Sequence, residues 1–357
     1  MTFVLGRDGG RDCGPTGRIG TYRALDGSAG APLHLDLDGP HAALVVGKRG
    51  YGKSYTLGVL AEELARTDGV APVVVDPMGV FASLAEVSSG SPVPATVERN
   101  PTVRASAVEP RSWCRLLGLD PEGSAGSLVW RAAASSETLS GMIDRVRASD
   151  APDAAVRAAA NHLRLAETWS VFAADGLGPT DLTGSEATVL DVSGLEAAPI
   201  NAVVRGVGAM LYRARVSAWV DRIPWLLVDE AHVFFDGVAA PALERVLTRG
   251  RAPGVSLVLA TQRPGVVPPV AVSQSDLLLA HRLTAEPDIE ALARAQPSYL
   301  DAALREKLPT ETGAVTVLDD ATETVHAARI RERDTPHDGE TPSVRALRGE
   351  SGETSGD

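Results

Sequence analysis

Short runs of Val, Leu and Ala alternate with segments of helical periodicity from Leu44 onward. Each run is bounded by turn residues, a pattern typical of strands that helices bury on both faces. Seven runs are expected to form strands: Ala42 to Val46, Pro72 to Val75, Thr188 to Val192, Trp225 to Val228, Ser256 to Ala260, Asp276 to Ala280 and Ala314 to Leu318. This order predicts an α/β fold in which a mostly parallel sheet is sandwiched between helices.

Three segments depart from this alternation and set the expected domain limits. Residues 1–41 are rich in Gly, Asp and Pro, and they predict a short N-terminal arm or one to three edge strands. A core domain is expected over residues 42–331, with a helical insertion at about 111–177 where apolar residues recur at helical spacing. Residues 332–357 contain few apolar side chains to offset the entropy of ordering, so a disordered tail is expected there.

Composition narrows the class of protein. The 44% of hydrophobic residues suffices for a full core, no stretch approaches the roughly 18 apolar residues of a membrane helix, and the first residues lack a signal peptide. A cytoplasmic protein without membrane contact is therefore expected. Cys13 and Cys114 lie far apart without metal-ligand spacing, which argues against a zinc site and a disulfide framework.

Acidic residues outnumber basic residues, and lysine is rare among the basic ones. The formal net charge of −12 excludes a globally basic nucleic-acid binder but leaves room for a local channel lined by arginines. Lysine occurs only at Lys48, Lys53 and Lys307, and 46 Asp plus Glu outnumber 34 Lys plus Arg. This balance fits a halophilic protein kept soluble in high salt, and it fits a GC-rich genome equally well.

The clearest chemical signal is a glycine-rich loop between the first predicted strand and a helix. The segment from Gly47 to Ser54, GKRGYGKS, fits the pattern GxxxxGK[ST]. In such a loop, backbone N–H groups and the helix dipole attract phosphate, Lys53 neutralises the β- and γ-phosphate oxygens, and the Ser54 hydroxyl can ligate Mg²⁺. The sequence predicts a site for ATP and Mg²⁺ with nucleotide contacts from Gly47, Lys48, Arg49, Gly50, Tyr51, Gly52, Lys53, Ser54 and Tyr55.

Two later strands deliver polar side chains at the points where they end. A strand ending at Val228 is followed by Asp229 and Glu230, and Gln262 follows another predicted strand. The carboxyl ends of parallel strands meet at one sheet edge, where ligands bind. Asp229 is therefore expected to hold Mg²⁺ together with Ser54. Glu230 is expected to polarise the attacking water, and Gln262 to sense the γ-phosphate or that water.

Two arginines lie on a Gly-rich turn just before the strand that precedes Gln262. A guanidinium is always charged and can bind two phosphate oxygens, so Arg249 or Arg251 could act as an arginine finger at a neighbouring subunit's ATP. Surface solvation is the commoner fate of such arginines. Asp76 also stands at the end of a predicted strand, but its chemistry alone assigns it no role.

Together these motifs resemble those of the HerA/FtsK superfamily of hexameric DNA-pumping ATPases, and they look most like HerA-type proteins of archaea. The matching segments run in order through residues 42–330: GKRGYGKSYT from Gly47, DPMG from Asp76, LDVSG from Leu190, DEAH from Asp229, GR at Gly250, ATQRP from Ala260, and HRLT from His281 near Pro287 and Asp288.

The resemblance implies a RecA-like P-loop core that assembles as a homo-hexamer, with ATP at the subunit interfaces. It implies that Lys53, Asp229, Glu230 and Gln262 have the roles argued above. It makes Arg251 the first candidate for a finger acting in trans. Arg282 is a second choice. It also implies a motor that translocates double-stranded DNA in DNA processing, with a NurA-type nuclease as a partner.

The chain departs from that family's pattern at its start and in its appendages. Residues 1–41 leave no room for the family's N-terminal β-barrel, and neither an FtsK-like membrane region nor a DNA-reading tail domain is expected. These departures bear on the nuclease partner and on processive DNA pumping. They leave the prediction of ATP hydrolysis intact.

Other classes compete with this interpretation. The letters DEAH from Asp229 also occur in DEAH helicases, but those enzymes need a second RecA-like domain, for which the chain after His232 is too short. A nucleotide kinase is disfavoured because Glu230 and Gln262 are hydrolase features. An ATP-dependent switch or scaffold that does not move DNA remains the open alternative.

Overall fold

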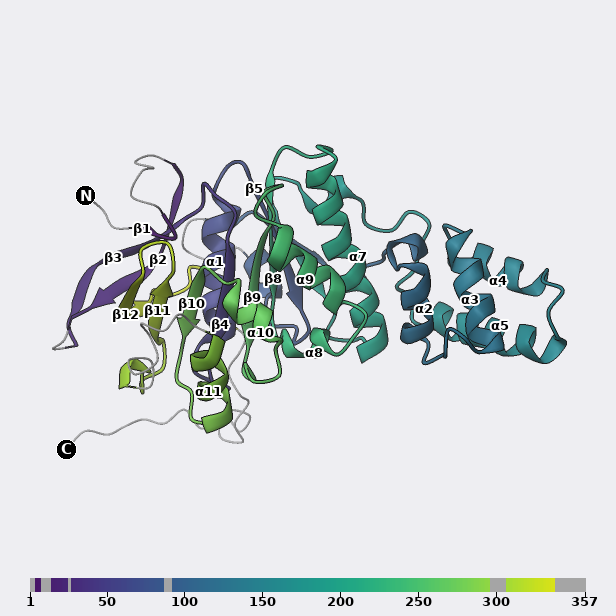
Figure 1. Cartoon of the computed structure of the whole chain (residues 1–357). Coiled ribbons are helices and arrows are strands. Elements are labelled where there is room, and N and C mark those ends of the chain that lie inside the picture. The colour runs from purple at the N-terminus through teal and green to yellow at the C-terminus, as the bar shows by residue number, and fades with distance from the viewer. Residues whose placement is uncertain (1–3, 8–13, 25–26, 87–91, 296–305, 338–357) are drawn as a thin grey trace, which may run out of the picture.

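The computed structural model describes residues 4–7, 14–24, 27–86, 92–295 and 306–337 (Figure 1). Within these residues, twelve strands join in a single sheet of order β1-β3-β2-β12-β11-β10-β4-β9-β8-β5-β7-β6. Its parallel part consists of β4 (Ala42–Val46), β5 (Val70–Asp76), β6 (Ala95–Glu98), β7 (Ala187–Asp191), β8 (Ile223–Val228), β9 (Ser256–Thr261) and β10 (Leu277–Ala280). The predicted fold class is confirmed. All these strands except β6, a short and only partly buried edge strand, were predicted.

The other strands extend the sheet beyond β10 in mainly antiparallel pairs. They are β1 (Val4–Leu5), β2 (Thr16–Arg23), β3 (Ala29–Asp36), β11 (Ala314–Asp319) and β12 (Thr324–Ile330). Strand β12 pairs with both β11 and β2, which places residues 324–330 beside the start of the chain. The described part of residues 1–41 thus adds three strands to the central sheet. Strand β11 was predicted from its apolar run, whereas the partly exposed β12 was not.

Helices cover both faces of the parallel strands. The helices are α1 (Lys53–Ala65), α2 (Pro110–Leu116), α3 (Ser124–Ala134), α4 (Leu139–Arg147), α5 (Asp153–Thr168), α6 (Pro179–Leu182), α7 (Ala197–Val216), α8 (His232–Phe235), α9 (Ala240–Arg249), α10 (Pro269–Ser273) and α11 (Glu286–Ala295), with 3₁₀ turns η1 (Ala82–Ala85) and η2 (Ala105–Ala107). Among the helices in the described ranges, none has the combined length and apolar character of a membrane span.

The two faces of the sheet carry separate hydrophobic clusters. Leu57 and Leu60 of α1 share one cluster with Val74 of β5. Leu211 of α7 shares the other with Val75, the next residue of the same strand. Successive side chains of a strand point to opposite faces, so a strand between two helical layers must be apolar at nearly every position. This is why the parallel strands appear in the sequence as continuous apolar runs.

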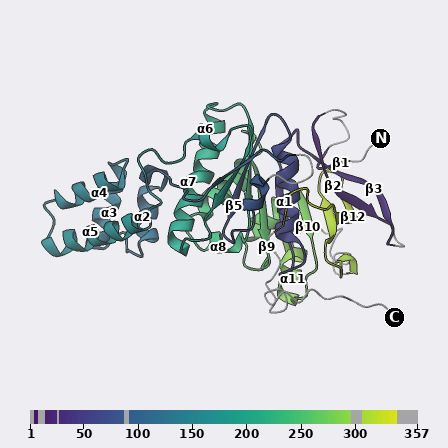
Figure 2. The same cartoon turned by 180° about the vertical axis from the view of Figure 1, so that it is seen from behind.

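Four helices, α2 to α5, occupy the range in which a helical insertion was expected. They have a buried cluster of their own that includes Trp113, Val129, Met142 and Leu163. They do not lie along the sheet: Figures 1 and 2 place them beyond α7, at the end of the molecule opposite β3. Ala202 of α7 joins their cluster, so α7 contacts both the sheet and this insertion.

Residues 332–337 differ from the expectation of a tail that is disordered from residue 332. Thr335 is 5% exposed, and its backbone N–H donates to the buried carboxylate of Glu62 in α1 at 2.9 Å. The amino-acid composition did not predict this contact, because polar groups hold the segment in place and not the burial of apolar side chains. The rest of the expected tail, residues 338–357, lies outside the described residues.

Candidate nucleotide-binding site

The predicted site residues follow three neighbouring strands that end at the same edge of the sheet. Strand β4 lies parallel to β9, with Val46 opposite Thr261, and β9 lies parallel to β8, with Leu259 opposite Val228. The loop after β4, the Asp–Glu pair after β8 and Gln262 after β9 therefore emerge side by side. The parallel register, which the sequence predicted only in general terms, brings these segments together.

The glycine-rich loop has a backbone that only glycine adopts without strain. Gly50 and Gly52 have φ angles of 82° and 112°, and Gly52 caps the N-terminus of α1. A Cβ at Gly47 would lie 2.6 Å from Cβ of His281, so a larger residue there would displace β10 or the loop. The loop thus leads directly into the N-terminus of α1, and the positive end of a helix dipole suits phosphate.

Lys53 and Ser54, the first residues of α1, face the acidic end of β8. Lys53 is only 5% exposed, and burial lowers the pKa of its ammonium group while Glu230 and Asp229 oppose that shift. The Ser54 hydroxyl donates to Oδ2 of the fully buried Asp229 at 2.7 Å. A hydroxyl and a carboxylate oxygen so close together fit Mg²⁺, which is usually held by one or two protein oxygens plus phosphate oxygens and water.

Among the described residues there is no cluster of three or more His, Cys, Asp or Glu side chains able to hold a metal.

Glu230 has the features of a poised base. Its φ angle of 47° is unusual for a residue with a side chain, and the neighbouring Ala231 N–H fixes this turn by donating to Ala260 O of β9 at 2.8 Å. Its Oε2 accepts a hydrogen bond from Gln262 Nε2 at 3.3 Å and lies 3.3 Å from His232 Nδ1. Burial raises the pKa of the Glu230 carboxyl, Asp229 raises it further, and Lys53 lowers it.

His281 supports the loop from the start of the segment after β10. The fully buried ring lies with Nε2 2.9 Å from Thr56 Oγ1 and Nδ1 2.9 Å from Ala314 O. Burial lowers the pKa of His281 to about 4, so the ring is neutral at physiological pH. It therefore joins α1 to β11 without adding charge beside Lys53.

A cavity of about 580 Å³ lies over these groups. Its lining includes the predicted residues Arg49, Gly50, Gly52, Lys53, Ser54, Tyr55 and Glu230. It also includes residues that the sequence did not indicate: Met78, Val80, Thr312, Gly313, Arg329, Ile330, Arg331, Glu332 and His337. The second set comes mainly from β12 and the segment after it, whose place next to the loop is set by strand pairing and not by any local motif.

Comparison with known proteins agrees with this geometry. Residues 18–139 match the family model described as "Helicase HerA, central domain". The structure of VirB4 of Thermoanaerobacter pseudethanolicus matches with a TM-score of 0.63 at 16% identity, covering 88% of this chain and 96% of that one. Residues 18–139 thus resemble the central domain of HerA, and the chain as a whole has the fold of VirB4.

Two structures of TrwB also resemble this chain in fold. The bacterial conjugative coupling protein TrwBdeltaN70, in its unbound form, matches with a TM-score of 0.52 at 13% identity over 95% of this chain and 99% of that one. The plasmid coupling protein TrwB in complex with the GTP analogue GDPNP gives a TM-score of 0.51 at 13% identity, over 94% and 99%. No curated protein matches the chain. At these identities the likeness shows the fold, so residue roles rest on the site itself.

Arg282 lies against the glycine-rich loop. Its Nη1 donates to the Tyr51 hydroxyl at 3.1 Å, and its guanidinium stands 5.2 Å from the centre of the Tyr51 ring. The Lys48 N–H donates to Arg282 O at 2.7 Å, while the Lys48 side chain is exposed. Arg282 and Lys48 thus shape the loop.

The two arginines before β9 lie away from the cavity over the glycine-rich loop. Arg249 ends α9 and Arg251 follows it, so both precede β9 and stand at the amino edge of the parallel strands. Arg251 is exposed beside a smaller cavity of about 140 Å³, which is also lined by His41 and Asp276. Neither arginine lines the cavity over its own loop.

Asp76, to which the sequence assigned no role, holds a turn that forms part of the cavity wall. It is fully buried and accepts hydrogen bonds from the backbone N–H groups of Met78 at 3.1 Å and Phe81 at 2.8 Å. Burial raises the pKa of its carboxyl, and these N–H groups lower it. The resulting turn carries Met78 and Val80 into the lining.

Proposed function

We propose that this protein hydrolyses ATP with Mg²⁺ in the cavity at the carboxyl edge of β4, β8 and β9. One observation carries the proposal: Lys53, Ser54 and Glu230 line the same cavity, and Ser54 Oγ lies 2.7 Å from Asp229 Oδ2. Phosphoryl transfer to water requires a phosphate-binding loop, ligands for Mg²⁺ and a base.

Each residue has a distinct role in this proposal. The loop amides and Lys53 bind the triphosphate, and Mg²⁺ between Ser54 and Asp229 would stabilise charge on the phosphate oxygens. Glu230 takes the proton of the attacking water. Lys53 opposes the rise in the pKa of Glu230 and so helps keep the carboxylate ionised. Gln262, hydrogen-bonded to Glu230, orients that carboxylate and the water.

We further propose that turnover drives translocation of double-stranded DNA by a homo-hexameric ring of the HerA type. The match of residues 18–139 to the HerA central domain supports this proposal. The similarity in fold to the coupling protein TrwB also supports it. DNA processing together with a NurA-type nuclease is the role that fits such a motor. The competing hypothesis is an ATP-dependent switch or scaffold that responds to a protein partner.

Double-stranded DNA is expected to stimulate phosphate release by the full chain about tenfold, because a motor couples ATP hydrolysis to movement along the polymer. The measurement compares turnover with and without linear duplex DNA at low and at molar salt, since phosphate contacts weaken steeply as salt rises. Lys53→Ala protein with DNA gives the background rate. Turnover that is equal with and without duplex DNA at both salt concentrations would favour the switch.

Arg251 is proposed as a finger that acts in trans, and subunit mixing tests it. Its position at the amino edge of β9 keeps it from its own ATP, so it can act only across an interface. Arg251→Ala and Glu230→Gln are each expected to be inactive alone, with a loss of about 1,000-fold or more for a missing finger. Mixing the two is expected to restore activity, because some interfaces then pair an intact Glu230 with an intact Arg251.

Arg249→Ala mixed in the same way serves as the control for the neighbouring arginine. A mixture of Arg251→Ala and Glu230→Gln subunits that stays inactive, although the subunits co-assemble, would remove Arg251 from the proposed mechanism.

A further inference from the structure

The cavity extends past the residues that would hold a triphosphate. Its volume of about 580 Å³ lies in the range of pockets that enclose whole small molecules. The glycine-rich loop and Glu230 account for one part of the lining. Half of the remaining lining is largely apolar or aromatic and consists of Tyr55, Met78, Val80, Ile330 and His337. The other half consists of Thr312, Gly313, Arg329, Arg331 and Glu332. The apolar and aromatic half suits the base and sugar of a nucleotide better than it suits phosphate.

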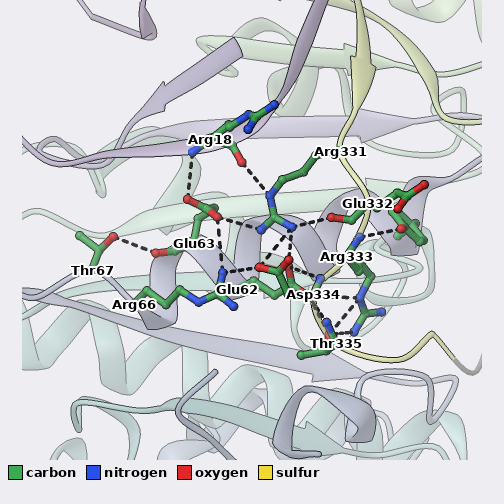
Figure 3. A network of polar contacts seen from close by, with 11 residues as sticks. Arg18, Glu62, Glu63, Arg66, Thr67, Arg331, Glu332, Arg333, Asp334 and Thr335 are labelled. Atoms are coloured by element: carbon green, nitrogen blue, oxygen red, sulfur yellow. Dashed lines mark hydrogen bonds and ion pairs between the residues drawn. The ribbon is translucent and has the colours of Figure 1, made fainter. Parts of the chain in front are cut away.

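Residues 331–337, which we name the α1 strap, form part of this second wall and lie along α1 (Figure 3). Their anchor is Glu62 of α1, which is fully buried. Its carboxylate accepts hydrogen bonds from the Thr335 hydroxyl at 2.7 Å and the Asp334 N–H at 3.2 Å, and it lies 2.8 Å from Arg331 Nη1. A buried carboxylate is costly without partners, so Glu62 fixes where the strap lies.

From this anchor, polar contacts lead toward the cavity. The Arg333 guanidinium donates to the Thr335 hydroxyl at 2.8 Å, and its Nη1 lies 3.2 Å from His337 Nδ1. The Arg333 N–H donates to the Tyr55 hydroxyl at 2.6 Å. The rings of Tyr55 and His337 then meet edge to face with their centres 5.1 Å apart, and both line the cavity.

A glycine inside α1 gives Arg333 its place. A Cβ on Gly58 would lie 2.7 Å from Cζ and 2.8 Å from Nε of Arg333, whose side chain is 1% exposed. Glycine in a helix interior lowers helix stability by about 1 kcal/mol relative to alanine, so Gly58 makes α1 less stable than an alanine would. The guanidinium occupies the space that an alanine methyl group would fill.

We propose that the α1 strap and Tyr55 form a nucleoside-binding wall that distinguishes a nucleotide from bare polyphosphate. The proposal rests on the proposed ATPase function, because it assumes that a triphosphate lies on the glycine-rich loop. The base and sugar then lie against the Tyr55 and His337 rings. Glu62, Thr335 and Arg333 act as positioning residues that hold these rings in place.

The test compares binding of ATP and of inorganic tripolyphosphate to the full chain by calorimetry, in the presence of Mg²⁺. Thr335→Val removes the hydroxyl between Glu62 and Arg333 at nearly constant volume, and Gly58→Ala displaces Arg333. Both variants are expected to bind ATP about tenfold more weakly and tripolyphosphate within about twofold of the unaltered chain. Thr335→Ser keeps the hydroxyl and is expected to retain ATP affinity.

Thr67→Val is the matched control just after the same helix, because the Thr67 hydroxyl donates to Glu63 O and does not touch the strap. If Gly58→Ala fails to fold, the comparison of Thr335→Val with Thr335→Ser provides the test. Circular dichroism checks the folding of each variant. Unchanged ATP affinity in folded Thr335→Val would overturn the proposal, and so would equal losses for ATP and tripolyphosphate. A wild-type chain that binds neither ligand would instead refute the proposed function.

Discussion

Replacing Glu230 by Gln is expected to stop ATP turnover while leaving ATP binding intact. The amide has nearly the same volume as the carboxylate but cannot accept a proton from the attacking water. A positioned base contributes roughly 100-fold to 10,000-fold, so the turnover number should fall by at least about 100-fold. Phosphate release at saturating ATP measures turnover, and calorimetric titration of ATP with Mg²⁺ measures affinity.

Glu167→Gln, on the exposed side of α5, makes the same chemical change far from the cavity and should leave both measurements unaltered. Turnover in Glu230→Gln close to that of the unaltered chain would show that another group activates the water. A parallel loss of ATP affinity would show that Glu230 acts in binding rather than in the chemical step.

Replacing Lys53 by Ala is expected to abolish tight ATP binding. Lys53 is the buried cation beside the predicted phosphate position, and its removal leaves Asp229 and Glu230 facing the triphosphate without compensation. Loss of one partner from a buried charged pair costs about 2–5 kcal/mol, which corresponds to a decrease in affinity of about 30-fold or more. Equilibrium titration with ATP and Mg²⁺ measures the change.

Lys307→Ala provides a matched control, because Lys307 is an exposed lysine outside the cavity. Its affinity for ATP should equal that of the unaltered chain. A Lys53→Ala protein that folds and still binds ATP with unaltered affinity would contradict the assignment of the loop as the phosphate site.

Parts of the site were predictable because they are local or follow from strand order. The proposed phosphate loop before Lys53 is one short segment, so the sequence pattern contains all of its residues. Asp229 and Gln262 were predictable because each follows a continuous apolar strand, and parallel strands end at a common edge. The contact between Gln262 and Glu230 at 3.3 Å required the actual register of β8 and β9.

Other features of the site had no local sequence pattern that could predict them. The strained backbone of Glu230 depends on the bond from Ala231 to β9, and the place of Arg282 on Tyr51 depends on the pairing of β4 with β10.

The sequence alone determined the α/β class, the phosphate loop and the acidic strand end, because apolar runs and glycine spacing act within single segments. Only the tertiary structure decided that β12 and residues 331–337 lie beside that loop. The polar composition of the segment after Arg331 predicted disorder. A buried carboxylate such as Glu62 nevertheless needs hydrogen-bond donors, and the fold supplies Thr335 and Arg331 from more than 260 residues away. Contacts between segments so far apart depend on how the sheet is ordered, which no short stretch of sequence specifies.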